Sequence, residues 1–175
     1  MAFIVEDGTG IEDANAYVDS EYISDYLMGE RLAQFEELDD DEQEAAIIAG
    51  TQYVDISYEY IGNRLSLEQG LNWPRVDAEY QGFVIEGVPT AVKKATCEAV
   101  WLAMTEEGGL FSTEGDKEVA SERIEGAVAI SYVNPKDKVK ETISRFEILD
   151  KLLKGLYFTE EQGGSSVGSA PVVRT

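Results

Sequence analysis

Histidine is absent from this chain of 175 residues, and cysteine occurs once, at Cys97. The absence of histidine removes the commonest general base, the commonest metal ligand and the usual partner of a serine or cysteine nucleophile. A single cysteine excludes an internal disulfide and a metal cluster built from cysteines, and no glycine-rich phosphate loop precedes a predicted helix. We therefore expect no enzyme activity, no catalytic or metal-binding residue and no cofactor, with Cys97 serving as a small buried apolar residue.

Long apolar runs are also missing. No stretch approaches the roughly 18 apolar residues that a membrane-spanning helix needs. The first residues lack a basic region followed by an apolar core, which is the pattern of a secretory signal peptide. These absences predict a protein that is made in the cytoplasm and has no membrane partner.

Basic residues are scarce, with 14 Lys and Arg against 35 Asp and Glu, for a formal net charge of −21. Residues 1–44 hold fifteen acids and only one base, Arg31, for a net charge of −14. Binding to a polyanion depends on Lys and Arg that neutralise phosphates, so this balance disfavours a broad nucleic-acid-binding surface. The 43% hydrophobic and 10% aromatic residues are ordinary for a folded protein. We expect one domain over 1–158 and a flexible tail over 159–175, where glycine and serine dominate.

Apolar residues at helical spacing predict four main helices, over about 20–28, 41–57, 89–107 and 143–155. The first follows a cap at Asp19 or Ser20. Each helix is expected to bury one stripe of side chains. In the first two helices the stripes are Tyr22, Ile23, Tyr26 and Leu27, and Ala45, Ile48, Ala49, Tyr53 and Ile56, the latter widened by Ile47 and Val54. In the last two they are Val92, Ala95, Thr96, Ala99, Val100 and Ala103, and Phe146, Leu149, Leu152, Leu153 and Leu156.

The acidic run Asp39–Glu44 has two interpretations. Clustered carboxylates can bind calcium. Alternatively, Asp40 or Asp41 caps a helix, with Gln43 or Glu44 completing a capping box three residues later. We favour capping, because the glycine and the regular spacing of a calcium loop are missing.

Strands are predicted only in short pieces. Phe83–Ile85 lies in a long glycine-punctuated connection from Arg64 to Gly87, and a β element with alternating residues covers about 119–133. The fold class that follows is mainly α, a small helical bundle with a short β-hairpin or strand element and an extended C-terminal arm.

Two features are candidates for contact with partners. Lys136, Lys138 and Lys140, together with Arg145, Lys151 and Lys154, form a basic cluster that either lies on a solvated face, docks on an acidic neighbour or touches DNA. Trp73, held in an extended conformation by Pro74, is either a core residue beneath the long connection or an anchor at an interface.

Several segments together resemble the small head–tail connector (adaptor) proteins of tailed phages. They are Ala14–Val18, Glu44–Tyr53, Leu71–Arg75, Val88–Ala99 and Ser121–Tyr132. Some sequences of that family carry the label of a DnaT-like single-stranded-DNA-binding protein.

The resemblance implies a structural virion protein that forms a ring, generally of twelve copies, in the neck between capsid and tail. Its partners would be further copies of itself, the portal protein and a stopper or tail-tube protein, and genome DNA would pass through the central channel without sequence-specific binding. The candidate interface residues are then Trp73, Arg75, Lys136, Lys138, Lys140, Pro171, Val172, Val173 and Arg174. The alternative function is a single-stranded-DNA-binding module, which needs aromatic side chains flanked by basic residues.

Overall fold

The computed structural model describes residues 2–105, 110 and 147–158. In these residues the helices are α1 (Ser20–Tyr26), α2 (Glu30–Glu36), α3 (Asp40–Ser57), α4 (Thr90–Thr105) and a last helix over 147–153. Between α3 and α4, β1 (Asn63–Arg64) pairs with β2 (Arg75–Val76), and β3 (Glu79–Tyr80) pairs with β4 (Phe83–Val84), both antiparallel. The mainly helical class with short strand elements is thus confirmed. The predicted β element at 119–133 and the tail at 159–175 lie outside the described residues.

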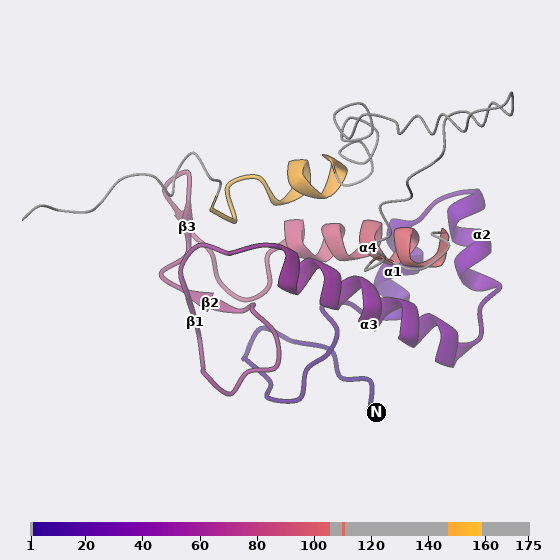
Figure 1. The fold of residues 1–175 in the computed structure, drawn as a ribbon, viewed down its shortest axis with the longest axis horizontal. Helices are drawn as coiled ribbons and strands as arrows, with labels where there is room; N and C mark the ends of the chain where they lie inside the picture. Colours follow the sequence, from indigo (N-terminus) through magenta and orange to yellow (C-terminus); the bar gives the residue numbers. More distant parts are fainter. Residues whose placement is uncertain (1, 106–109, 111–146, 159–175) are drawn as a thin grey trace, which may run out of the picture.

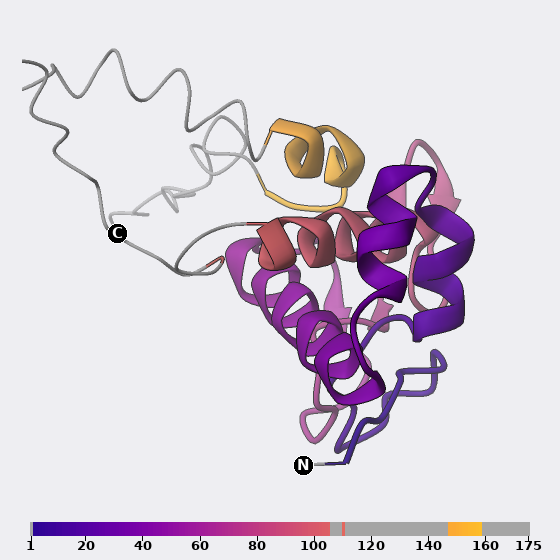
Figure 2. The ribbon, with the colours of Figure 1, turned by 90° about the vertical axis from the view of Figure 1, so that its right-hand side faces the viewer.

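Helix α4 occupies the centre of the described structure, with α3 on one side and the 147–153 helix on the other (Figures 1 and 2). Helices α3 and α4 approach closely at Gly50, where an added Cβ would lie 2.7 Å from the backbone nitrogen of Val100. Since a contact that short would force the backbones apart, glycine at position 50 permits this packing.

The buried side of α3 differs from the predicted stripe. The residues buried along this helix are Ile47, Gly50, Thr51, Val54 and Asp55. Ile47 and Val54, which we expected only at the margin, lie in its middle, whereas Ala45 and Ile56 are exposed. The prediction failed because it counted only apolar residues, while a glycine and two polar side chains complete the face that packs against the rest of the protein.

Capping explains where α1 and α3 begin. The Asp19 side chain accepts a hydrogen bond from the backbone N–H of Tyr22, as predicted for α1. At α3 the capping box is present one residue earlier than predicted, with Asp39 as the cap and Glu42 as its partner. Within the described residues, no group of acidic or cysteine side chains could hold a metal ion.

Helix α4 agrees closely with its prediction. It begins one residue after Pro89, and Val92, Ala95, Thr96, Ala99 and Val100 are fully buried. Residues 106 and 107, the predicted end, lie outside the described part of the chain. No helix of the described residues is long and apolar enough to cross a membrane.

The segment 147–158 joins the core through both side chains and backbone. Leu149, Leu153 and Leu156 are buried in the same cluster as residues of α3 and α4. The backbone N–H of Ile61 donates to the Leu156 carbonyl at 3.0 Å, and that of Phe158 donates to the Glu59 carbonyl at 2.9 Å. The helix over 147–153 confirms the described part of the predicted last helix, whose residues 143–146, including Phe146, lie outside the described residues. The backbone contacts place Phe158 beside the end of α3.

The β3–β4 hairpin projects apolar side chains into solvent. Gln81 and Gly82 in its turn both have positive φ, at 53° and 82°, as in the tight turns that fit the twist of two-residue hairpins. Phe83 and Val84 are 75% and 71% exposed. The hairpin contains most of the predicted strand at Phe83–Ile85.

Candidate functional site

The segment Leu71–Arg75, which carries part of the family resemblance, lies in the protein interior. Trp73 is fully buried, and its ring meets the Tyr60 ring edge-on with centroids 5.6 Å apart. The peptide bond between Trp73 and Pro74 is cis. This location corresponds to the first alternative for Trp73, a core residue beneath the long connection.

A buried polar network joins this segment to the N-terminal part of the chain and to α3. The Tyr17 hydroxyl donates a hydrogen bond to Asp55, and it accepts one from the backbone N–H of Trp73 at 3.1 Å. The backbone N–H of Asn72 donates to Asp55 Oδ1 at 2.8 Å, and Asn72 Nδ2 donates to Asp55 Oδ2 at 3.1 Å. One carboxylate therefore holds together three segments that are distant in sequence.

The network shifts the pKa values of its acidic groups. Burial raises the pKa of Asp55 above its ordinary value, although the hydrogen bonds from Tyr17 and Asn72 partly oppose this. Burial, reinforced by the negative charge of Asp55, raises the pKa of Tyr17 well above that of an ordinary tyrosine. Both shifts arise because a charge is costly where water is excluded.

Two arginines near this network bind backbone carbonyl groups. Arg75 donates from Nε to the Ile61 carbonyl at 2.7 Å and from Nη2 to the Gly62 carbonyl at 2.8 Å. Arg64 donates to the carbonyls of Gln69 and Leu71. Their guanidinium groups thus brace the connection between α3 and α4, although Arg64 is exposed and its printed hydrogen bonds use only Nη2.

The third arginine of the described residues is also engaged internally. Arg31 forms an ion pair with Glu98 at 2.8 Å and stacks over the Trp101 ring at 5.1 Å. Glu98 is 7% exposed and also accepts a hydrogen bond from the Tyr26 hydroxyl at 2.8 Å. This cluster fastens α1 and α2 to α4.

Few cations therefore remain available on the described surface. Besides the arginines, the described residues contain four lysines: Lys93, Lys94, Lys151 and Lys154. Lys93 lies over the Tyr22 ring and Lys151 pairs with Glu147 at 2.7 Å. Because 24 Asp and Glu stand against seven Lys and Arg in these residues, the described surface is strongly electronegative.

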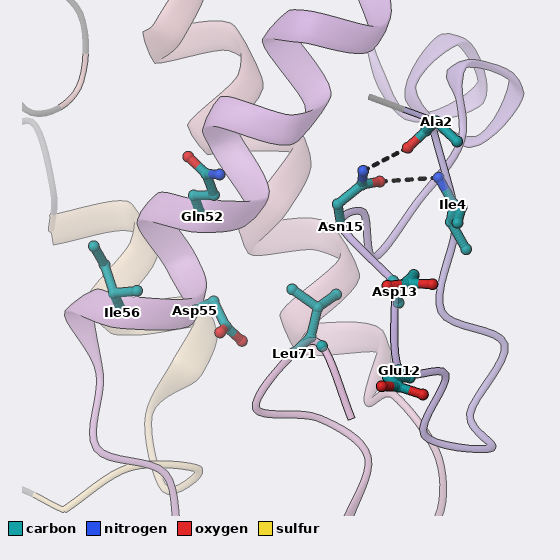
Figure 3. A pocket seen from close by; sticks show the side chains of 11 residues that line it. Ala2, Ile4, Glu12, Asp13, Asn15, Gln52, Asp55, Ile56 and Leu71 are labelled. Atoms are coloured by element: carbon teal, nitrogen blue, oxygen red, sulfur yellow. Dashed lines mark hydrogen bonds between the residues drawn. The ribbon is translucent and has the colours of Figure 1, made fainter. Parts of the chain in front are cut away.

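An open groove of about 680 Å³ lies between the N-terminal segment and the end of α3 (Figure 3). One wall is formed by residues 2–15 and the other by α3 residues that include Gln52 and Ile56, with Leu71 between them. Ile56 is 68% exposed. The groove therefore offers accessible apolar surface next to the buried network.

The rim of the groove is acidic. Glu12 and Asp13 lie on the N-terminal side and are both exposed, and no cation within the described residues pairs with either. Asn15 does not point freely into the groove, because its side chain bonds the Ala2 carbonyl and the Ile4 N–H at 2.7 and 2.9 Å (Figure 3). The arrangement suits a ligand with apolar groups and a positive charge.

The candidate interface residues are not gathered at one place. Trp73 is enclosed, and Arg75 is half-buried and bound to backbone carbonyls. The remaining candidates lie outside the described residues: Lys136, Lys138, Lys140, Pro171, Val172, Val173 and Arg174. Their role at an interface stays a prediction.

Cys97 lies on α4 with its side chain fully buried, as expected. Burial, together with the neighbouring Glu98 charge, raises the pKa of the thiol to about 12. The thiol therefore stays protonated at neutral pH, whereas nucleophilic attack requires a thiolate.

The sequence did not reveal the Tyr17–Asp55–Asn72 network. Tyr17 and Asn72 nevertheless lie in two of the segments that carry the family resemblance, Ala14–Val18 and Leu71–Arg75. Asp55 carried a usable signal, because it is the one acidic residue of α3 after Glu44 and lies directly beside the apolar Val54. A buried carboxylate requires partners, and such a position points to polar residues elsewhere in the chain that can donate to it.

A comparison with protein-family models matches residues 1–175 to the family described as “Putative DnaT-like ssDNA binding protein”. Neither the curated proteins nor the solved structures include a match to the chain. The match spans the whole chain, including the residues that carry the polar network and the acidic groove.

Proposed function

We propose that this chain, which belongs to the family described as “Putative DnaT-like ssDNA binding protein”, is a structural head–tail connector. Some connector sequences carry that family label. In this proposal the protein assembles into a ring of about twelve copies in the neck of a tailed phage. The ring joins the portal to a stopper or tail-tube protein, and genome DNA passes through its channel.

The observation that carries the proposal is how the charged side chains are used. The three arginines of the described residues bind Glu98 or backbone carbonyls, whereas most of the acids face solvent. A surface of one sign repels phosphates over a screening length of about 8 Å at physiological salt. Such a surface favours the passage of DNA over its retention.

The buried network supports a structural role in the same way. Tyr17, Asp55 and Asn72 satisfy one another, so the Asp55 carboxylate, which lines the groove, is already bound within the protein. The resembling segments Ala14–Val18 and Leu71–Arg75 meet through this network. We therefore assign these segments to holding the body in shape for assembly, with no catalytic step.

A second candidate function is single-stranded-DNA binding, which the family's description favours. The described surface does offer an exposed aromatic side chain, Phe83, on the β3–β4 hairpin. Its hairpin carries Glu79, and Glu86 follows it, whereas base-stacking sites combine aromatic side chains with a positive groove. Binding would therefore depend on the lysines at 136, 138 and 140.

Titration of the full chain with a fluorescent oligothymidylate at several salt concentrations separates the two functions. A connector is expected to show no measurable binding near physiological salt. Tight binding that weakens steeply with salt would reject the connector and support the second function. In that case the variant Lys136→Glu/Lys138→Glu/Lys140→Glu should abolish binding, with Lys93→Glu/Lys94→Glu as the matched control.

Electron microscopy of negatively stained protein, alone and mixed with the portal protein of the same phage, tests the assembly directly. Rings of about twelve copies are expected on the portal. Single chains that ignore the portal would contradict the proposal.

A further inference from the structure

The acidic groove between residues 2–15 and α3 has no occupant among the described residues. From its chemistry and its place beside Phe158, we infer that the groove binds residues 170–175 of the same chain, Ala-Pro-Val-Val-Arg-Thr. This inference goes beyond the connector proposal and does not depend on it.

Charge and polarity match between the groove and this segment. Pro171, Val172 and Val173 are apolar, and Arg174 is the only basic residue after Lys154. In the groove, the exposed Ile56 and the half-buried Ile4 offer apolar surface, while Glu12 and Asp13 supply carboxylates at the rim that pair with no cation of the described residues. We assign the valines to these apolar walls and the guanidinium of Arg174 to the rim, where a bidentate contact with a carboxylate is favourable.

The path of the chain makes this occupant reachable. Phe158 lines a second pocket of about 550 Å³, and Asp55 and Ile56 line both that pocket and the groove. Residues 159–169, which connect Phe158 to the segment, can span at most about 40 Å when fully extended. The tether therefore starts next to the groove and is long enough to enter it.

Tethering also removes the need for high affinity. A segment joined by a short linker meets its own site at an effective concentration in the millimolar range. Weak contacts by two valines and one arginine are then sufficient for occupancy. In a connector, the groove would hold the segment until a partner protein offers a better site.

Disulfide crosslinking of the full chain tests the inference. The variant Val173→Cys/Ile56→Cys places one thiol on the segment and the other in the groove. The matched control, Val173→Cys/Leu67→Cys, uses Leu67, which is 92% exposed and does not line the groove. Cys97 is buried and does not interfere.

Under mild oxidation at low protein concentration, we expect the Ile56→Cys variant to form an intramolecular crosslink about tenfold faster than the control, a ratio that corresponds to modest preferential docking. Equal rates for the two variants would overturn the inference. Crosslinks that form only between chains would also overturn it, because the segment would then occupy the groove of a second copy.

Reversing the charges of Arg174 and of the rim in the Val173→Cys/Ile56→Cys variant provides a second test, again by the rate of crosslinking. Arg174→Glu is expected to slow the intramolecular reaction, and adding Glu12→Arg/Asp13→Arg is expected to restore it. If Arg174→Glu leaves the rate unchanged, the assignment of Arg174 to the acidic rim is wrong.

Discussion

Two buried carboxylates on neighbouring helices, Asp55 on α3 and Glu98 on α4, are stabilised in different ways. Asp55 receives its described hydrogen bonds from neutral donors, the Tyr17 hydroxyl and the backbone and side chain of Asn72. Glu98 receives a hydrogen bond from the Tyr26 hydroxyl and an ion pair from Arg31. Asp55 and Glu98 are 8% and 7% exposed, so burial alone does not distinguish them.

The difference lies in what each carboxylate connects and in the access of its partners to water. Asp55 joins the segments around Tyr17 and Trp73 to α3, through partners that are themselves buried or half-buried. Glu98 fastens α1 and α2 from the outside, with an arginine side chain that is 34% exposed. Neutral donors avoid burying a second charge, whereas a half-exposed arginine stays partly hydrated. We expect the Asp55 network to contribute more to stability.

The largest expected effect is that of Asp55→Ala. This change leaves the Tyr17 hydroxyl and the Asn72 donors without an acceptor, and a loss of about 3 kcal/mol in the free energy of unfolding is expected. Glu98→Ala should cost less, about 1–2 kcal/mol, because water can reach Arg31. Chemical denaturation followed by circular dichroism measures both. A greater loss for Glu98→Ala would reverse the comparison.

The two tyrosines provide a finer test, because each loses only a hydroxyl in a change to phenylalanine. Tyr17→Phe removes the donor to Asp55 and the acceptor for the Trp73 N–H, and we expect a loss of about 1–3 kcal/mol. Tyr26→Phe leaves Glu98 its arginine, so about 0.5–1.5 kcal/mol is expected. The same denaturation experiment compares them. Equal losses in the free energy of unfolding would show that the hydrogen bonds around Asp55 stabilise the protein no more than those around Glu98.

The smallest expected effect is a difference in pH dependence. Since burial raises the pKa of Asp55 above 3.8, the folded state holds this proton more tightly than the unfolded state. The stabilising contribution is complete below pH 3.8 and is lost as the pH rises through the raised pKa. Stability measured from pH 3.5 to pH 7 should therefore fall relative to Asp55→Asn, by less than about 1.4 kcal/mol per pH unit.

A stability difference between wild type and Asp55→Asn that does not change with pH would contradict the assigned shift.

Sequence patterns predicted the helices well wherever periodicity and capping agreed. Helix α4 begins beside Pro89 and buries all of its predicted stripe except Ala103, which is half-buried, and α1 begins directly after its predicted cap, Asp19. Helix α3 was located correctly, but its buried side was not. The apolar pattern could not anticipate that Gly50 would meet Val100 or that Asp55 would be buried with polar partners.

The candidate site shows the same division. Trp73 was identified as a fixed aromatic residue, but its enclosure by Tyr60 and the core depends on chain segments far away in sequence. The acidic groove was not predicted, because Glu12 and Ile56 are far apart in the sequence and lie in one groove only in the folded chain.

By itself, the sequence determined the approximate positions of α1, α3 and α4, the excess of acidic charge and the absence of histidine chemistry, because these depend on residue type and on spacing within a few residues. Tertiary structure alone decided which polar groups are buried together and which apolar ones stay exposed. Hydrogen bonds and burial depend on distances in space, so pairing Tyr17 with Asp55, Arg31 with Glu98 and Gly50 with Val100 required the folded chain.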